Sequence, residues 1–139
     1  MSVSFIDTNL FIYLFDETAP EKRARSQKLI QSSIETKNGV ISYQVVQETL
    51  NVLTTKLQNP AASEDARLLF QTVLLPLWRI NPHHKLYESA IDILSRYRYG
   101  FYDSLIIAAA LKAGCTQLIS EDLQSGQHIE KLKIVNPFL

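Results

Sequence analysis

The sequence predicts an α/β fold in which a mostly parallel sheet is covered by helices on both faces. Short apolar runs alternate along the chain with longer segments of helical pattern, which is the order expected of parallel strands joined by helices. No internal repeat and no linker interrupts this alternation. We therefore expect residues 1–139 to form a single domain.

Each predicted element is marked by its residue pattern. Strands are expected at the short apolar runs over residues 3–6, 40–42, 77–80, 117–120 and 132–135. Helices are expected over residues 10–15, 20–36, 43–57, 63–74, 83–97 and 101–113. Pro20 suits the first turn of its helix, and Ser63 is expected to cap the N-terminus of another. Gly114 is placed to cap the end of the last helix.

The composition excludes several classes of protein. Hydrophobic residues make up 46% and charged residues 20%, which is typical of a globular chain and not of a disordered one. The longest apolar runs, such as residues 105–111, fall far short of the ~20 residues that a membrane span needs. Asp7 and Asn9 interrupt the apolar N-terminus, so no signal peptide is expected. The single cysteine, Cys115, allows no internal disulfide and favours a cytoplasmic location.

The net charge makes no broad case for nucleic-acid binding. Fourteen lysines and arginines balance fourteen aspartates and glutamates. The basic residues nevertheless fall into two groups: Lys22, Arg23, Arg25 and Lys28, and later Arg79, Lys85, Arg96 and Arg98. Either group would suit a groove that follows a nucleic-acid backbone, but solvated helix faces explain them equally well.

Five carboxylates lie where the predicted fold would bring them together. Asp7 ends the first strand, and Glu121 and Asp122 directly follow the fourth. Glu48 lies early in the helix after the second strand, and Asp103 lies in the first turn of the helix before the fourth. Ligands of open α/β sheets bind beyond the carboxyl ends of the strands, so we expect these acids to meet at one edge of the sheet.

A simpler interpretation is that some of these acids only stabilise helix starts. Asp7 and Asp103 are well placed for capping, which contributes roughly 1 kcal/mol. Capping does not explain Glu48, which lies inside its helix. Carboxylates in apolar surroundings also need a cation, a hydrogen bond or a metal.

A convergent group of carboxylate oxygens without cysteine or histidine predicts Mg²⁺ or Mn²⁺ in preference to Zn²⁺. Such a metal holds an anionic phosphate and activates water for attack on phosphorus. Polar neighbours are expected to support the carboxylates or to contact phosphate: Thr8, Asn9, Ser104 and Ser120. No glycine-rich phosphate loop, serine nucleophile elbow or zinc-ligand spacing offers a competing site, and Cys115 and the three histidines are not expected to be catalytic.

Four motifs occur in the order and approximate spacing of PIN domains: Phe5-Ile6-Asp7-Thr8-Asn9, Gln47-Glu48, Tyr102-Asp103-Ser104-Leu105-Ile106 and Ser120-Glu121-Asp122-Leu123. The chain resembles the single-domain PIN toxins of prokaryotic type II toxin–antitoxin modules over nearly its whole length. This resemblance implies a three-layer α/β/α fold and a Mg²⁺- or Mn²⁺-dependent endoribonuclease. It implies a small protein antitoxin as partner and a homodimer. By motif position it places the catalytic and metal-binding roles on Asp7, Glu48, Asp103 and Asp122.

Two alternatives to the ribonuclease remain open at this stage. One is a non-catalytic RNA- or protein-binding module of the same fold, and the other is a different Mg²⁺-dependent phosphotransfer enzyme with Asp7 as nucleophile. Glu121 also competes with Asp122 for the fourth acidic role. Because adjacent residues of an extended segment point in opposite directions, only one of the two can readily face the crevice. The resemblance to PIN domains favours Asp122, so we expect Glu121 to face solvent or cap the next turn.

Overall fold

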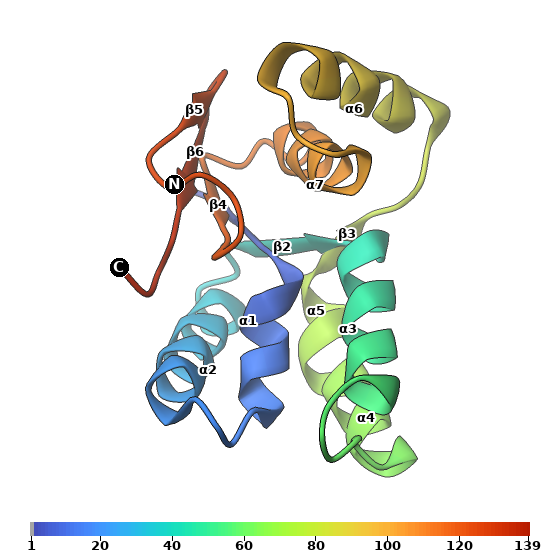
Figure 1. The fold of residues 1–139 in the computed structure, drawn as a ribbon, viewed down its shortest axis with the longest axis vertical. Helices are drawn as coiled ribbons and strands as arrows, with labels where there is room; N and C mark the ends of the chain where they lie inside the picture. Colours follow the sequence, from blue (N-terminus) through green and yellow to red (C-terminus); the bar gives the residue numbers. More distant parts are fainter. Residues whose placement is uncertain (1) are drawn as a thin grey trace.

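The computed structural model describes residues 2–139, whose centre is a six-stranded sheet in the order β3-β2-β1-β4-β6-β5 (Figure 1). The strands are β1 Ser4–Ile6, β2 Gly39–Ser42, β3 Trp78–Ile80, β4 Gln117–Ile119, β5 His128–Ile129 and β6 Leu132–Val135. All neighbouring strands pair in parallel except β5 and β6, which pair antiparallel. The predicted mostly parallel sheet is thus confirmed.

Helices cover both faces of the sheet, and the three-layer α/β/α arrangement is visible in Figure 1. One layer contains α1 Thr8–Ile12, the 3₁₀ turn η1 Tyr13–Phe15, α2 Pro20–Glu35, α3 Tyr43–Thr55, α4 Ser63–Leu69, η2 Phe70–Leu74 and α5 Leu75–Leu77. The opposite layer contains α6 His84–Tyr97 and α7 Phe101–Lys112. The α/β class and the expected helices are confirmed.

Helix α7 lies between the sheet and α6, and its sequence fits this position. Every residue from 104 to 110 is buried, so the helix has no polar face. Ala108, Ala109 and Ala110 are small enough to let α6 approach closely. A similarly close approach fixes the start of β2, where a Cβ on Gly39 would lie 2.8 Å from Ser33 Cβ.

Two local predictions were wrong. The helix after residue 60 begins at Ser63 itself, and its N-cap is Ala62, which makes no capping side-chain bond. That helix also continues beyond residue 74 through a π-helical turn into α5. Pro76 has no N–H to donate to the carbonyl four residues earlier, and the wider π turn comes directly before it.

Strand β5 was not expected at all. Its two residues contain no apolar run, and it exists because His128 and Ile129 pair back onto β6. Gly114 does adopt the left-handed conformation expected of a helix C-terminal residue, with φ +74°. Within residues 2–139, no helix is both long enough and apolar enough to cross a membrane.

Candidate acidic metal site

The site lies where the neighbouring parallel strands β1 and β4 end together. Ile6 is paired with Ile119, so the next residues, Asp7 and Ser120, lie side by side. The backbone N–H of Asp7 donates to the Ile119 carbonyl at 3.0 Å. The strand register therefore places Asp7 beside the segment that carries Glu121 and Asp122.

Asp7 is the most enclosed of the predicted acids, with 8% of its surface exposed. Its Oδ1 accepts the Thr8 backbone N–H at 2.7 Å, and its Oδ2 accepts the Ser120 hydroxyl at 2.8 Å. Burial raises the pKa of Asp7 to about 6, against the lowering effect of these two hydrogen bonds, and repulsion from Glu48 and Asp122 adds to the rise. Asp7 thus caps α1, as the simpler interpretation proposed, and also belongs to a group of interacting carboxylates.

Glu48 is held from two sides. The Thr8 hydroxyl donates to its Oε2 at 3.1 Å, and the Gln44 amide donates to its Oε1 at 2.8 Å. The same amide reaches the Tyr102 carbonyl at 3.2 Å, which joins α3 to the start of α7 beside Asp103. Gln44 was not among the predicted site residues, although its position one helical turn before Glu48 was a usable signal.

Asp103 and Asp122 are exposed but lie within electrostatic reach of the other two acids. Partial burial raises the pKa of Asp103, and repulsion from Asp122 and Glu48 raises it further. Repulsion from Asp122 also raises the pKa of Asp7. The structure therefore brings Asp7, Glu48, Asp103 and Asp122 close enough for their charges to act on one another, as the positions of the strand ends predicted.

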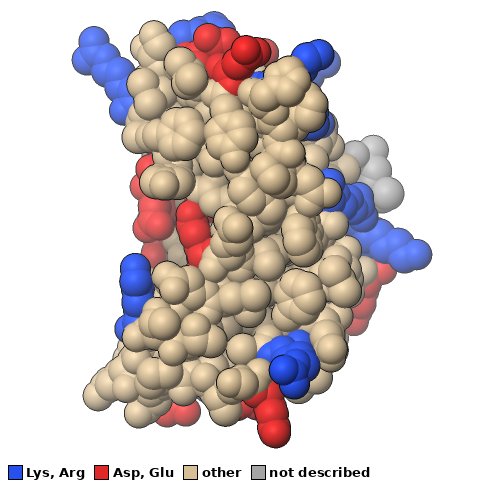
Figure 2. Space-filling model, turned by 90° about the vertical axis from the view of Figure 1, so that its right-hand side faces the viewer, with Lys and Arg blue, Asp and Glu red and all other residues tan. Residues whose placement is uncertain are grey.

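The four carboxylates form a loose ring and not a finished coordination sphere. Among residues 2–139, no three His, Cys, Asp or Glu side chains already stand at a spacing that would hold a metal ion. The one ion pair of the described chain joins Lys22 to Glu121, so none of the four acids has a cationic partner. Figure 2 shows acidic side chains around a hollow at one edge of a largely uncharged face. The chemistry of these oxygen donors fits Mg²⁺ or Mn²⁺, and the metal remains a prediction.

The predicted supporting residues divide into two pairs. Thr8 and Ser120 hold carboxylates directly, as expected. Asn9 and Ser104 do not: in the described chain, the side-chain amide of Asn9 and the hydroxyl of Ser104 are buried without a hydrogen-bond partner. Neither of these two holds a carboxylate, and their other expected role, contact with a phosphate oxygen, stays a prediction.

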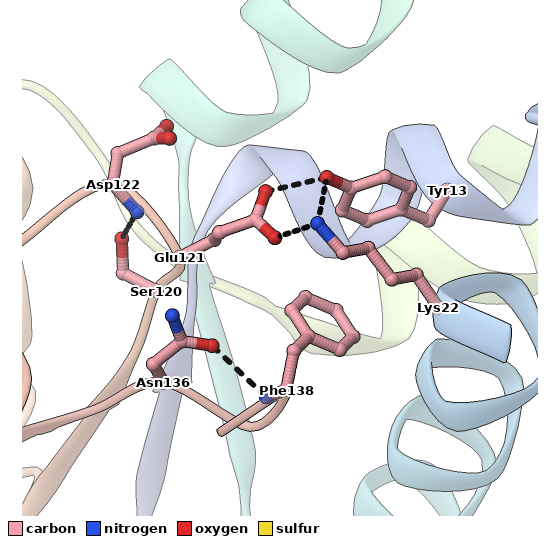
Figure 3. A network of polar contacts seen from close by, with 7 residues as sticks. All are labelled: Tyr13, Lys22, Ser120, Glu121, Asp122, Asn136 and Phe138. Atoms are coloured by element: carbon pink, nitrogen blue, oxygen red, sulfur yellow. Dashed lines mark hydrogen bonds and ion pairs between the residues drawn. The ribbon is translucent and has the colours of Figure 1, made fainter. Parts of the chain in front are cut away.

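Glu121 turns away from the ring, although not toward solvent. Its carboxylate accepts the Tyr13 hydroxyl and pairs with Lys22, while the Asp122 carboxylate lies outside this contact (Figure 3). Partial burial alone would raise the pKa of Glu121, but the bonds from Lys22 and Tyr13 outweigh it and lower that pKa. The predicted solvent-facing or capping role of Glu121 was wrong, because Tyr13 and Lys22 bind its carboxylate. Residues 121–123 form a bend and not the extended segment expected.

Other reactive side chains lie apart from this ring. Cys115 is buried in the core, and burial raises the pKa of its thiol to about 11, which disfavours a reactive thiolate. His83 caps α6 by accepting the Lys85 backbone N–H, and His84 and His128 are exposed. Of the basic groups, Lys22 is occupied by Glu121, and Arg25 donates to the Pro137 carbonyl at 2.7 Å.

These observations define an α/β/α protein with a ring of acidic residues at the carboxyl edge of a parallel sheet. The family model of the PIN domain matches residues 4–127. The chain therefore belongs to the PIN domain family.

Solved structures share this fold at low sequence identity. A toxin–antitoxin complex from Klebsiella pneumoniae has a TM-score of 0.67 at 17% identity, covering 96% of this chain and 97% of the other. VapC20 of Mycobacterium tuberculosis, described as a sarcin-ricin loop cleaving toxin, has a TM-score of 0.61 at 21% identity, covering 86% and 89%. The FitAB complex bound to a DNA fragment has a TM-score of 0.75 at 16% identity, covering 99% and 96%. A sequence comparison with curated proteins gave no significant match.

Proposed function

We propose that this protein is a Mg²⁺- or Mn²⁺-dependent endoribonuclease, with Asp7, Glu48, Asp103 and Asp122 as its metal-binding residues. One observation carries the proposal: four carboxylates from separate elements repel one another, and no cationic side chain of the described residues pairs with them. This repulsion disfavours the charged forms of Asp7 and Asp103 unless a cation occupies the site. A divalent ion bound by these carboxylates would relieve the repulsion and would provide the catalytic group for RNA hydrolysis.

The metal, when bound, would hold a phosphate oxygen of RNA and lower the pKa of a water molecule, so that hydroxide forms near neutral pH. The residues of the chain prepare the site for it. Ser120 and Thr8 fix the two oxygens of Asp7, and Gln44 and Thr8 fix those of Glu48. Asp7 must also lose its proton before it binds a cation, so its raised pKa limits the site in acid.

The substrate belongs to the same proposal. VapC20 is described as cleaving the sarcin-ricin loop, which supports RNA as the substrate of this fold. The single cysteine supports action in the cytoplasm, where RNA is available.

We further propose that the protein is the toxin of a type II toxin–antitoxin module and binds a small antitoxin. One structural neighbour is described as a toxin–antitoxin complex from Klebsiella pneumoniae, which supports such a partner. An apolar groove of about 730 Å³ lies between η1, α2 and α4, and its apolar lining includes Leu14, Phe15, Ile30, Ile34, Leu68 and Val73. Leu68 is 60% exposed there, and an apolar segment of an antitoxin would cover it.

A homodimer is the expected state of the free protein. Apolar or aromatic side chains stay exposed on α6 and at the start of α7, namely Tyr87, Ile91, Leu94 and Tyr102. We propose that a second copy covers these side chains. Sedimentation of the purified protein, compared with Ile91→Asp, tests this part separately from catalysis.

The test of the central proposal is a cleavage assay on a structured RNA, with wild type and Asp7→Asn side by side. Wild type is expected to cut in Mn²⁺, and Asp7→Asn is expected to lose both cleavage and Mn²⁺ binding. If Asp7→Asn cleaves as well as wild type, the acidic ring is not the active site. If wild type binds Mn²⁺ and RNA without cutting, the protein is a binding module of the PIN fold.

A further inference from the structure

A polar network outside the acidic ring attaches the turn that carries Asp122 to η1 and α2. We propose that Tyr13, Lys22 and Glu121 form an anchor that positions Asp122, and that Glu121 is a positioning residue and not a metal ligand. This inference rests on the proposed metal site and assigns a task to the fifth carboxylate.

The contacts of the anchor are mutual. Glu121 accepts the Tyr13 hydroxyl on Oε1 and pairs with Lys22 through Oε2. Lys22 Nζ also reaches the Tyr13 hydroxyl at 3.3 Å, so each of the three side chains contacts the other two. Figure 3 shows this triangle beside the turn of Ser120 and Asp122. Loss of any one member therefore leaves the other two incompletely paired.

Aromatic rings partly shield the ion pair from water. Lys22 Nζ lies 5.2 Å from the centroid of the Tyr13 ring and 5.4 Å from that of Phe138. The two rings pack edge to face, with centroids 5.3 Å apart. The side chain of Glu121 keeps 22% exposure and that of Lys22 keeps 41%. Partial shielding makes this pair stronger than a fully solvated one, which contributes little.

The anchor joins segments that the sheet does not join. Lys22 and Tyr13 belong to α2 and η1, whereas Glu121 follows β4, 99 residues after Lys22. The C-terminal segment closes over the contact, because Arg25 of α2 holds the Pro137 carbonyl at 2.7 Å next to Phe138. The turn after β4 is thus fixed against a helix on its outer side.

On its inner side, the same turn is fixed by Ser120. The Ser120 hydroxyl donates to Asp7 and accepts the backbone N–H of Asp122 at 3.2 Å. Within residues 2–139, no hydrogen bond restrains the Asp122 carboxylate itself, so its position depends on the backbone between these two attachments. Pairing with Lys22 also cancels the charge of Glu121, which leaves four net negative side chains at the ring.

The test uses Glu121→Gln, Lys22→Met and the double variant, with Lys28→Met on the exposed side of α2 as matched control. Two measurements are made on the metal-free full chain: amide hydrogen exchange of residues 120–124, and Mn²⁺ affinity by calorimetry. Each single variant is expected to speed exchange in this turn and to raise the Kd for Mn²⁺ about 3- to 10-fold, less than the loss of a direct ligand partner. The double variant is expected to be no worse than either single one, because both remove the same contact.

Conservative changes separate positioning from a general loss of stability. Lys22→Arg is expected to restore Mn²⁺ affinity close to wild type. Tyr13→Phe keeps the ring but removes the hydroxyl bonded to both Glu121 and Lys22, and it is expected to speed exchange of residues 120–124. At saturating Mn²⁺, Glu121→Gln is expected to cleave RNA at nearly the wild-type rate, so the defect appears in metal affinity and not in the maximal rate.

Unchanged exchange and unchanged Mn²⁺ affinity in Glu121→Gln and Lys22→Met would overturn the anchor. Equal weakening by Lys28→Met would also overturn it, because the effect would then be one of overall charge. The failure of the proposed function looks different: wild type would bind Mn²⁺ and cleave no RNA, while the exchange and affinity of the variants would still decide the anchor.

Discussion

The hydroxyl of Ser120 donates a hydrogen bond to Asp7 Oδ2 at 2.8 Å and so connects the ends of two neighbouring parallel strands. The same oxygen accepts the backbone N–H of Asp122 at 3.2 Å. One fully buried side chain therefore orders two of the predicted metal ligands. This bond also lowers the pKa of Asp7, against a larger opposite effect of burial.

Ser120→Ala is expected to raise the pKa of Asp7 beyond about 6, because the variant loses a bond that favours the charged carboxylate. The acid limb of the cleavage rate against pH should move to higher pH, and stability should fall by about 1–2 kcal/mol. Rate profiles and urea unfolding check this. Ser125→Ala, which removes an exposed hydroxyl that accepts the Asn136 backbone N–H, should leave the pH profile in place.

Asp7→Asn should change how stability depends on pH. A folded-state pKa of about 6, raised from 3.8, means that the folded protein binds this proton more tightly than the unfolded chain does. The Asp7 carboxyl thus stabilises the metal-free wild type most below pH 3.8, and this contribution is lost as pH rises through 6, by about 3 kcal/mol in total.

The asparagine variant lacks this titration. Wild type should therefore lose stability relative to Asp7→Asn between pH 4.5 and pH 7.5, as measured by urea unfolding without metal. A constant difference between the two proteins across this range would show that Asp7 does not titrate there.

Asp103→Asn should melt no lower than wild type in the absence of metal, while cleavage is abolished. The pKa of Asp103 is raised by partial burial, Asp122 and Glu48, so removing its charge relieves repulsion. Asp92→Asn on the exposed side of α6 provides a control for the change of charge. A large fall in Tm for Asp103→Asn would point to a structural hydrogen bond from Asp103.

Asp122→Asn is expected to lose at least ~10-fold in cleavage rate at saturating Mn²⁺, about 1.4 kcal/mol of barrier. Glu121→Gln should change that rate little, because its side chain is directed to Tyr13 and Lys22. Single-turnover assays on the two variants check this. The reverse order would move the fourth acidic role onto Glu121.

Most of the fold could be predicted from the sequence because its elements have strong local patterns. The strands β1, β2, β3, β4 and β6 coincide with apolar runs. The two-residue β5 has no such run, and it depends on pairing with β6. The π-helical turn before Pro76 likewise follows from the conflict between a proline and a continuing helix, which a pattern of apolar residues does not reveal.

Some features of the candidate site could likewise be predicted from the sequence, and others could not. The ends of parallel strands meet at one edge, so the grouping of Asp7 and Asp122 followed from topology. The bond from Gln44 to Glu48 lies within one helical turn and was open to prediction. The pairing of Lys22 with Glu121, 99 residues away, was not, because nothing local links α2 to the turn after β4.

The most direct test of the account is whether cleavage depends on a divalent metal. Purified wild type, stripped of metal, is incubated with a structured RNA in EDTA, and Mn²⁺ or Mg²⁺ is then added in excess. We expect no cleavage in EDTA, because the acidic ring cannot hold a phosphate without a metal ion. Cleavage by wild type should return when the metal is added, and cleavage by Asp7→Asn should not. Cleavage undiminished by exhaustive chelation would contradict the account.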